Sequence, residues 1–344
     1  MSGHDTRLSA QRLILASAPL VLLLVFLAVI AVVEPRVVEP SNLKEVVIQA
    51  SPIAILALGA MVVLITGGID LSAGFGVAMI AVAMVGSMGI EGDLLHGLLI
   101  ALLFGLGLGL VNGLLVGVLR IPAFIATLAT FTAVQGVTLT RAKSGTLIVS
   151  DPTLLRIGTG TVAGIPFPIV IAAGVALVMI VLMRLTRFGV RTYAIGSGEP
   201  DAARLSGVPV ARHLVLVYVL AGLLTTVTAV LLAGRSGVVA PNIGGVSLLL
   251  DAIAATVIGG TSIFGGRGTV WGTLVGAIII ALITNALRVS GADASSLDLW
   301  RGGIIGLALL VDAALQFLRR RLEDREISLG TAGAADDDRV AAAA

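Results

Sequence analysis

The chain has 344 residues, of which 57% are hydrophobic and only 12% are charged, with a formal net charge of +2. Soluble domains carry about 25% charged residues, so the composition excludes an ordinary soluble domain and predicts a chain largely surrounded by lipid. There is no cysteine, which excludes disulfides and thiolate metal sites, and the three histidines are too scattered to form a metal cluster. The basic residues lie at the ends of apolar runs, as membrane topology requires, and nucleic acid is therefore rejected as a partner.

A helix needs about 20 apolar residues to cross the hydrocarbon layer. On this rule the sequence predicts an all-α integral membrane protein with about ten transmembrane helices between residues 13 and 318. The first apolar run is too long for a cleavable signal and lacks a small-residue cleavage site, which favours a retained helix. The predicted spans are 13–33, 46–66, 72–90, 95–119, 121–140, 166–184, 213–233, 247–263, 269–289 and 299–318.

Arginines in the short loops predict the orientation, because positive charge stays on the cytoplasmic side. Residues 1–12, the long loop 185–212 and the segment after residue 318 carry most of the arginines, and the loops on the other side carry fewer. Both termini are therefore expected in the cytoplasm. The tail 319–344 has no apolar periodicity and is expected to be disordered, with its "DDD" as a solvated run.

Asp70 is the only charged residue between Val46 and Ile90, and it lies in the glycine-rich stretch "LITGGIDLSAGFG". Gly67 and Gly68 permit a turn with positive φ, so the stretch is expected to form a cytoplasmic turn between two spans. Asp70 or Ser72 would then cap the helix that follows. The alternative is a conformationally important turn beside a transport pathway, because a carboxylate in a membrane is costly.

A second stretch, "VIGGTSIFGGRG" from Val257 to Gly268, predicts another tight cytoplasmic turn. A dinucleotide-binding interpretation fails because no soluble βαβ unit surrounds it. The turn glycines of this stretch are Gly259, Gly260, Gly265 and Gly266.

Two similar segments indicate an internal repeat. "LGLVNGLLVGVLRIP" in the fourth span resembles "IIALITNALRVSG" in the ninth, with Asn112 and Asn285 in matching places. Spans five apart run in opposite directions, so the pattern indicates an inverted five-helix repeat, which is typical of transporters. Polar side chains in otherwise apolar helices are candidates for a pathway, the alternative being hydrogen bonds between helices. The candidates are Asn112, Phe124, Thr127 and Asn285.

The loop 185–212 contains "EPDAARLSG", which has the pattern of a short helix with its own caps. Glu199 suits the cap and Pro200 the first position, while Gly207 suits the left-handed stop. Such a helix is either a surface anchor or a docking element for a cytoplasmic partner. The segment consists of Glu199, Pro200, Asp201, Ala202, Ala203, Arg204, Leu205, Ser206 and Gly207.

Four long stretches resemble the permease subunits of ribose-type ABC sugar importers. They are "TGGIDLSAG", "RIPAFIATLATFT", "FGVRTYAIGSGEPDAARLSGVPV" and "LLDAIAATVIGGTSIFGGRGTVWGTLVGA". They occur in the family's order, and the resemblance extends over about residues 45–315. It implies a permease domain over residues 13–318 in a bacterial cytoplasmic membrane, forming the translocation pathway for a monosaccharide. It also implies a second permease copy, cytoplasmic ATPase subunits and an extracytoplasmic sugar-binding protein, with "EPDAARLSG" as the coupling helix.

The residues of the chain agree with a separate ATPase. Its only lysines are Lys44 and Lys143, and neither follows a glycine, so the sequence contains no P-loop. We therefore expect a non-enzymatic subunit without a cofactor, with ATP bound by another chain. Nucleosides or branched-chain amino acids are the alternative substrates. An ion-coupled secondary transporter is disfavoured because its ionisable groups usually lie at mid-membrane, whereas Asp70, Asp251, Arg301 and Asp312 are expected near span ends.

Overall fold

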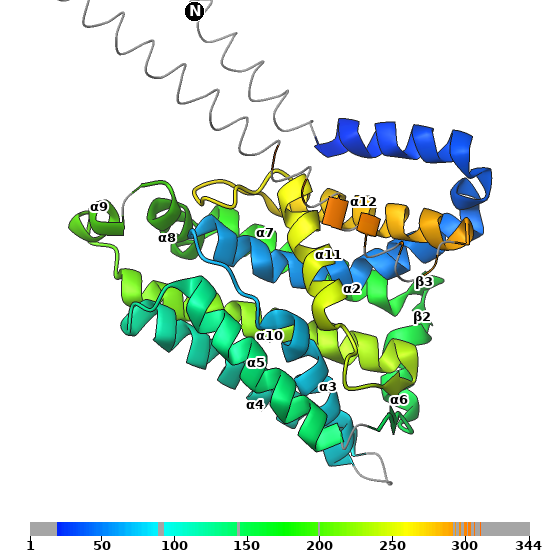
Figure 1. Cartoon of the computed structure of the whole chain (residues 1–344), viewed down its shortest axis with the longest axis horizontal. Coiled ribbons are helices and arrows are strands. Elements are labelled where there is room, and N and C mark those ends of the chain that lie inside the picture. Colours follow the sequence, from blue (N-terminus) through cyan, green and yellow to red (C-terminus); the bar gives the residue numbers. More distant parts are fainter. Residues whose placement is uncertain are drawn as a thin grey trace, which may run out of the picture.

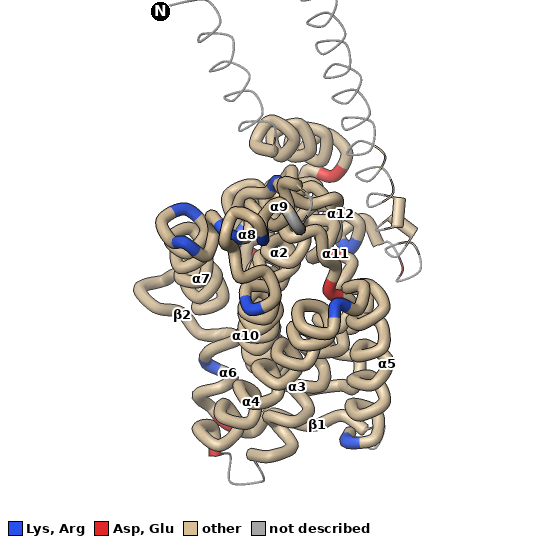
Figure 2. Tube along the Cα trace, turned by 90° about the vertical axis from the view of Figure 1, so that its left-hand side faces the viewer, with Lys and Arg blue, Asp and Glu red and all other residues tan. Residues whose placement is uncertain are grey.

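The computed structural model describes residues 19–88, 93–142, 145–198, 200–291 and isolated positions between 293 and 310. This part of the chain is a bundle of helices with a few very short strands (Figure 1). Charged residues lie mainly at helix ends and in connections, and long stretches between them are uncharged (Figure 2). The expected end segments 1–12 and 319–344, and most of the expected span 299–318, lie outside the described residues.

Six helices in the described part are long and apolar enough to cross a membrane, and each overlaps one predicted span. α4 continues into a π-helical turn, η2, before the tight connection at Arg120–Pro122. The six are α2 (Pro40–Ile65), α4 (Leu94–Gly113) with η2 (Leu114–Val118), α5 (Ala123–Ala142), α7 (Phe167–Leu185), α10 (Val210–Ser236) and α12 (Val270–Val289).

Three further apolar helices are shorter: the helix Pro19–Val33, α3 (Ala73–Met88) and α11 (Gly245–Ile258). α3 has 16 residues and α11 has 14, which correspond to about 24 and 21 Å, less than the about 30 Å of hydrocarbon. The expected span 247–263 is therefore too long. α11 ends at Ile258 because two glycines follow, the second of which, Gly260, has a φ of +87°.

The remaining elements lie at the two ends of the bundle. α8 (Arg187–Gly196) and α9 (Pro200–Leu205) mark one end, called here the α9 end (Figure 1). The opposite end carries α6 (Pro152–Thr159), an antiparallel pair of β1 (Leu147–Ile148) and β4 (Val238–Val239), and a hairpin of β2 (Thr161–Val162) and β3 (Ile165–Pro166). The short 3₁₀ helix η1 (Pro35–Val38) precedes α2.

The packing of α4 on α10 depends on small residues at every fourth position. Gly105 and Gly109 of α4 face the α10 backbone, and a Cβ at either would overlap an atom of α10. Gly113 and, in η2, Gly117 continue the same face, and a Cβ at either would lie 2.7 Å from a backbone atom of α10. Because lipid offers no hydrophobic drive between helices, such close backbone approach is what holds them together.

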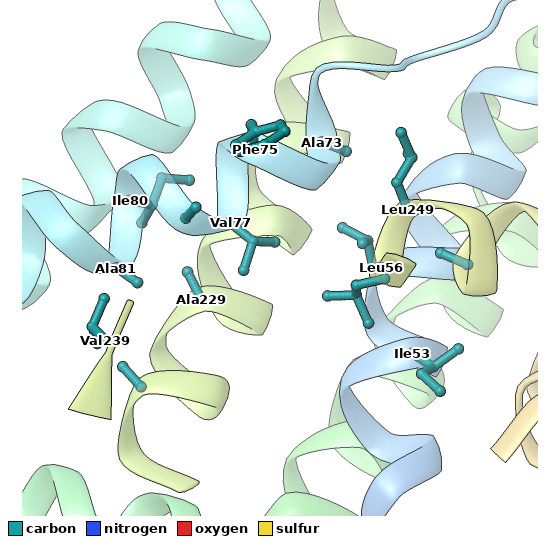
Figure 3. Close-up of a cluster of buried hydrophobic side chains, with 14 of the residues drawn as sticks. Ile53, Leu56, Ala73, Phe75, Val77, Ile80, Ala81, Ala229, Val239 and Leu249 are labelled. Carbon is teal, nitrogen blue, oxygen red and sulfur yellow. The ribbon is translucent and has the colours of Figure 1, made fainter. Parts of the chain in front are cut away.

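The N-termini of the two short helices α3 and α11 meet in the middle of the bundle. A Cβ at Gly74, near the start of α3, would lie 2.5 Å from the carbonyl oxygen of Gly245, the first residue of α11. Figure 3 shows the apolar core around this junction, with Leu249 of α11 and Leu56 of α2 facing the start of α3. From there α3 continues past Ala229 of α10 towards Val239.

The helix contacts follow a paired pattern. α4 packs on α10 as α12 packs on α2, and α3 packs on α4 as α11 packs on α12. α3 also touches α10, as α11 touches α2. The contacts among α3, α4 and α10 thus correspond to those among α11, α12 and α2.

Candidate functional site

A chain of polar side chains joins three separate segments in the apolar core. The segment 66–72, between α2 and α3, carries Asp70 and Ser72. One oxygen of Asp70, Oδ1, accepts hydrogen bonds from the Ser72 backbone N–H at 2.9 Å and from Ser72 Oγ at 2.6 Å. Asp70 thus holds the backbone immediately before α3, a capping role like the one its place in the sequence predicts.

Asn112 of α4 connects this carboxylate turn to α5. Its side-chain Nδ2 donates to Ser72 Oγ at 2.7 Å, and its Oδ1 accepts from Thr130 Oγ1 at 2.7 Å. The Asn112 and Ser72 side chains are fully buried. We refer to Asp70, Ser72, Asn112 and Thr130 as the polar relay.

Thr127 of α5 holds the segment 66–72 through a backbone carbonyl of that segment. Its Oγ1 lies 3.0 Å from the carbonyl oxygen of Ile69 and 2.8 Å from that of Ala123, and its one hydroxyl proton serves both acceptors. Thr127 is fully buried. Of the four pathway residues predicted from sequence, Asn112 and Thr127 therefore share one site.

The other two pathway candidates lie elsewhere. Phe124 is in the first turn of α5, and 54% of its side chain is exposed. Asn285 lies on α12, where its Oδ1 accepts a 2.8 Å hydrogen bond from Asn42 of α2. The structure does not bring Asn285 to the polar relay because α12 packs on α2 and α11, whereas the relay joins α4 and α5 to the segment before α3.

Ser72 and Thr130 were not predicted as pathway residues, although both belong to the relay. Thr130 follows Thr127 by three residues, so the two hydroxyls share one face of α5. That spacing in the sequence could have indicated Thr130. Its partner Asn112 could not be predicted from the sequence, because Asn112 lies on a different helix.

The segment 66–72 differs from the surface turn expected from sequence. The turn is confined to Thr66–Gly68, where Gly67 has a φ of +78°. The chain then extends into the centre of the bundle, where α3 starts (Figure 1). Asp70 and Ser72 are therefore interior residues, because α3 starts beside the middle of α10: a Cβ at Gly76 would lie 3.3 Å from Thr225.

A second acidic residue is also interior. Asp251 lies in the middle of α11 and is 5% exposed. Asp251 therefore does not lie near the end of its helix, contrary to expectation, whereas Asp70 does lie between the end of α2 and the start of α3. Arg301 and Asp312 lie outside the described residues. In the described part of the chain, no group of three or more metal-ligating side chains is placed to hold a metal ion.

Two adjoining cavities lie between α4 and α5, over α3. The one nearer the start of α5, which we call the inner cavity, has a volume of about 450 Å³ and is apolar except for Thr130. The outer one, of about 580 Å³, has Ser87, Thr138 and Arg141 among its lining residues. Both are lined by Met79 and Phe104, so they adjoin. Thr130 is thus both part of the polar relay and part of a cavity wall.

The segment predicted to couple to a partner does contain a short helix, α9. Ala203 is buried against Ile195 of α8 and Val210 of α10, which fixes the helix to the bundle. Leu205 is 91% exposed on the other side. Gly207 has a φ of +79°, the left-handed stop expected at this position. Glu199 lies outside the described residues.

The turn 259–268 lies beside the end of α2. Its Gly266 N–H donates to the Ile65 carbonyl oxygen at 2.8 Å, and Gly265 and Gly266 have φ values of +94° and +74°. Tyr193 of α8 donates from its hydroxyl to the Gly268 carbonyl oxygen at 2.8 Å. Burial raises the pKa of the Tyr193 phenol above its ordinary value, so the hydroxyl stays protonated at neutral pH.

Six helices in the described part of the chain are long and apolar enough to cross a membrane, which is the architecture of a multi-pass membrane protein. The chain belongs to the family described as the permease component of branched-chain amino acid transport systems, whose model matches residues 42–311.

Several curated relatives are similar over most of their length. The ribose import permease protein of Bacillus subtilis is 36% identical over 297 residues, which cover 86% of this chain and 91% of the relative. The galactose/methyl galactoside import permease protein of Salmonella typhimurium is 35% identical, covering 88% of this chain and 94% of the relative. The L-arabinose permease protein of Azospirillum brasilense is 32% identical, covering 91% of each. No solved structure matches the chain.

Proposed function

We propose that this chain is the membrane permease subunit of an ABC importer for a monosaccharide. The names of the relatives, which state ribose, galactose and arabinose, support this substrate class over nucleosides or branched-chain amino acids. The observation that carries the proposal is the polar relay beside the two cavities. Hydroxyl and amide groups are suitable partners for sugar hydroxyls, and these lie in an otherwise apolar core.

The proposed pathway passes along the cavities between α4 and α5. A sugar crossing the membrane exchanges water for protein hydrogen bonds, and unpaired hydroxyls in an apolar setting cost several kcal/mol. Thr130 lines the inner cavity and reaches the relay through Asn112. Arg141 and Ser87 line the outer cavity. Phe124, exposed at the start of α5, would border the inner end of this route, whereas the packing of Asn285 favours a role between helices.

The proposed assembly contains a second permease copy, two cytoplasmic ATPase subunits and an extracytoplasmic sugar-binding protein. The chain has no P-loop sequence, so ATP would bind to the partner ATPases. α9 would dock on an ATPase, with the exposed Leu205 as its apolar contact. The second copy would cover the α4–α5 face and close the cavities from lipid.

The proposed membrane architecture is ten helices with an inverted five-helix repeat, both termini in the cytoplasm, in the inner membrane. The corresponding contacts among α3, α4 and α10 and among α11, α12 and α2 support the repeat. So does the junction of α3 and α11, whose N-termini meet, an arrangement found at transporter midplanes. The arginine-rich segment 185–212 supports a cytoplasmic position for the α9 end.

The test is ATP-driven uptake in proteoliposomes that contain the permease with its ATPase and binding protein. We expect uptake of a monosaccharide from a panel of ribose, galactose, arabinose and xylose, and none of leucine or uridine. Uptake driven by a proton or sodium gradient without ATP would instead establish a secondary transporter.

A matched pair of variants locates the pathway. Thr130→Val removes a hydroxyl of the relay, and Thr132→Val removes an exposed one that bonds only within its own helix. We expect Thr130→Val to reduce uptake about tenfold, the effect of losing about 1.4 kcal/mol, and Thr132→Val to leave it unchanged. Equal uptake by both variants would contradict a pathway beside the relay.

A further inference from the structure

Three backbone segments meet at the end of α8, four residues before α9 begins. The Gly266 N–H of the turn 259–268 donates to the carbonyl oxygen of Ile65, the last residue of α2. Gly196, the last residue of α8, lies against both groups. A Cβ at Gly196 would overlap the Ile65 carbonyl oxygen and come within 2.6 Å of the Gly266 nitrogen.

Gly265 and Gly266 of the turn 259–268 also need to lack side chains where they face Gly196. A Cβ at Gly265 would lie 3.0 Å from the Gly196 carbonyl oxygen and 3.1 Å from the Gly67 nitrogen. A Cβ at Gly266 would lie 2.9 Å from the same Gly196 oxygen. The three segments thus pack backbone to backbone, and such contacts are stiff because no side chain can yield between them.

One side-chain hydrogen bond joins α8 to the turn a second time. Tyr193, one helical turn before Gly196, donates from its hydroxyl to the Gly268 carbonyl oxygen. Together, Tyr193, Gly196, Ile65 and Gly266 form what we call the backbone junction.

Along the chain, the backbone junction lies between α9 and the short helices α3 and α11. Ile65 is followed by the segment 66–72, which carries Asp70 and leads to the start of α3. The turn that contains Gly266 follows the end of α11. A displacement of α8 would therefore press on the chain that leads to α3 and on the chain that leaves α11.

We propose that the backbone junction transmits movement of α9 to the polar relay, with Gly196 and Tyr193 as positioning residues for energy coupling. This inference rests on the proposed function, because coupling has a meaning only if an ATPase docks on α9. Leu205, the proposed docking contact, is not part of the junction, so a change at the junction can lower transport while docking through Leu205 is kept.

The experiment compares Gly196→Ala with Gly198→Ala in the reconstituted complex of permease, ATPase and binding protein. Gly198 is exposed, and a Cβ there meets no atom within 4 Å, so Gly198→Ala is the matched control. The readouts are the amount of ATPase that copurifies and the number of sugar molecules imported per ATP hydrolysed. A change in folding or yield alone would lower uptake and hydrolysis together and leave this ratio unchanged.

We expect Gly196→Ala to retain the ATPase but to lower the ratio about tenfold, within the range of about 5- to 150-fold typical of coupling between sites. Gly198→Ala should have the wild-type ratio. Tyr193→Phe removes only a hydroxyl and should lower the ratio several-fold. If Gly196→Ala does not assemble, Tyr193→Phe alone tests the role of the backbone junction.

A wild-type ratio in Tyr193→Phe and in any assembled Gly196→Ala complex would overturn the inference and leave the proposed function intact. Absence of ATP-driven sugar uptake by the wild-type complex would overturn the proposed function and this inference with it.

Discussion

The side-chain amide of Asn112 donates a 2.7 Å hydrogen bond to Ser72 Oγ, and so ties α4 to the residue that precedes α3. The two residues are 40 positions apart in the chain. This bond places the only amide of the polar relay between a carboxylate turn on one side and the Thr130 hydroxyl on the other.

Asn112→Ala should reduce uptake strongly while it costs little stability. Ser72 Oγ still donates to Asp70, and Thr130 Oγ1 still has carbonyl acceptors within α5. Hydrogen bonds between membrane helices are worth about 0.6 kcal/mol on average and about 1.7 kcal/mol at most, so the thermal unfolding midpoint in detergent should fall only slightly. A large loss of folded protein would instead assign Asn112 a purely structural role.

Asp70→Asn should preserve the fold and much of the uptake, and Asp70→Leu should not. One oxygen of Asp70, Oδ1, accepts hydrogen bonds from both the N–H and the hydroxyl of Ser72, and the side-chain carbonyl of Asn can accept the same two. Leu accepts neither, so we expect a loss of about 0.5–2 kcal/mol, as for a missing helix cap. The measurement is uptake normalised to membrane expression. Abolished uptake in well-expressed Asp70→Asn would show that the negative charge itself is required.

Gly109→Ala should destabilise the permease by about 1–3 kcal/mol, the cost of inserting a methyl group into a packed interface. The added Cβ would overlap the Tyr218 carbonyl oxygen of α10. Gly107→Ala on the same helix is the control, because a Cβ there meets nothing within 4 Å. Thermal unfolding of both purified variants in detergent is the measurement, and equal midpoints would contradict close packing of α4 on α10.

Leu205→Asp should abolish copurification of the ATPase without affecting membrane insertion. Leu205 is 91% exposed, so it packs little against the described part of the chain. Loss of a hot-spot contact in an interface costs about 2 kcal/mol or more, which corresponds to about a 30-fold weaker complex. Thr159→Asp, an exposed change at the opposite end of the bundle, is the control. Full ATPase binding by Leu205→Asp would place the docking contact elsewhere, for example in the turn 259–268.

Tyr218→Phe should leave uptake unchanged and raise stability by up to about 1 kcal/mol. Among the described residues, the hydroxyls of Tyr218 and Thr261 are the buried side-chain groups without a hydrogen-bond partner, and an unpaired buried hydroxyl is costly. Uptake and the unfolding midpoint are measured on the same preparation. Reduced uptake would mean that the Tyr218 hydroxyl acts in transport.

The sequence by itself determined that lipid surrounds this protein and which segments form its helices. Apolar runs of about 20 residues require lipid, and in lipid the backbone must satisfy its own hydrogen bonds within each helix. Nine of the ten predicted spans accordingly overlap apolar helices in the described part of the chain. The stop at Gly207 and the helix before it were also readable, because a left-handed glycine ends a helix through local geometry alone.

Only the tertiary structure decided which polar residues meet and how deep they lie. Asp70 looked like a surface turn because its neighbours are glycines, yet the chain after Gly68 extends inward to reach α3. Asn112 and Asn285 looked equivalent in sequence, yet Asn112 bonds Ser72 and Asn285 bonds Asn42, 243 residues away. Helix formation depends on hydrogen bonds four residues apart, whereas these partners are set by which helices pack together, and that choice depends on glycine contacts between segments far apart in the chain.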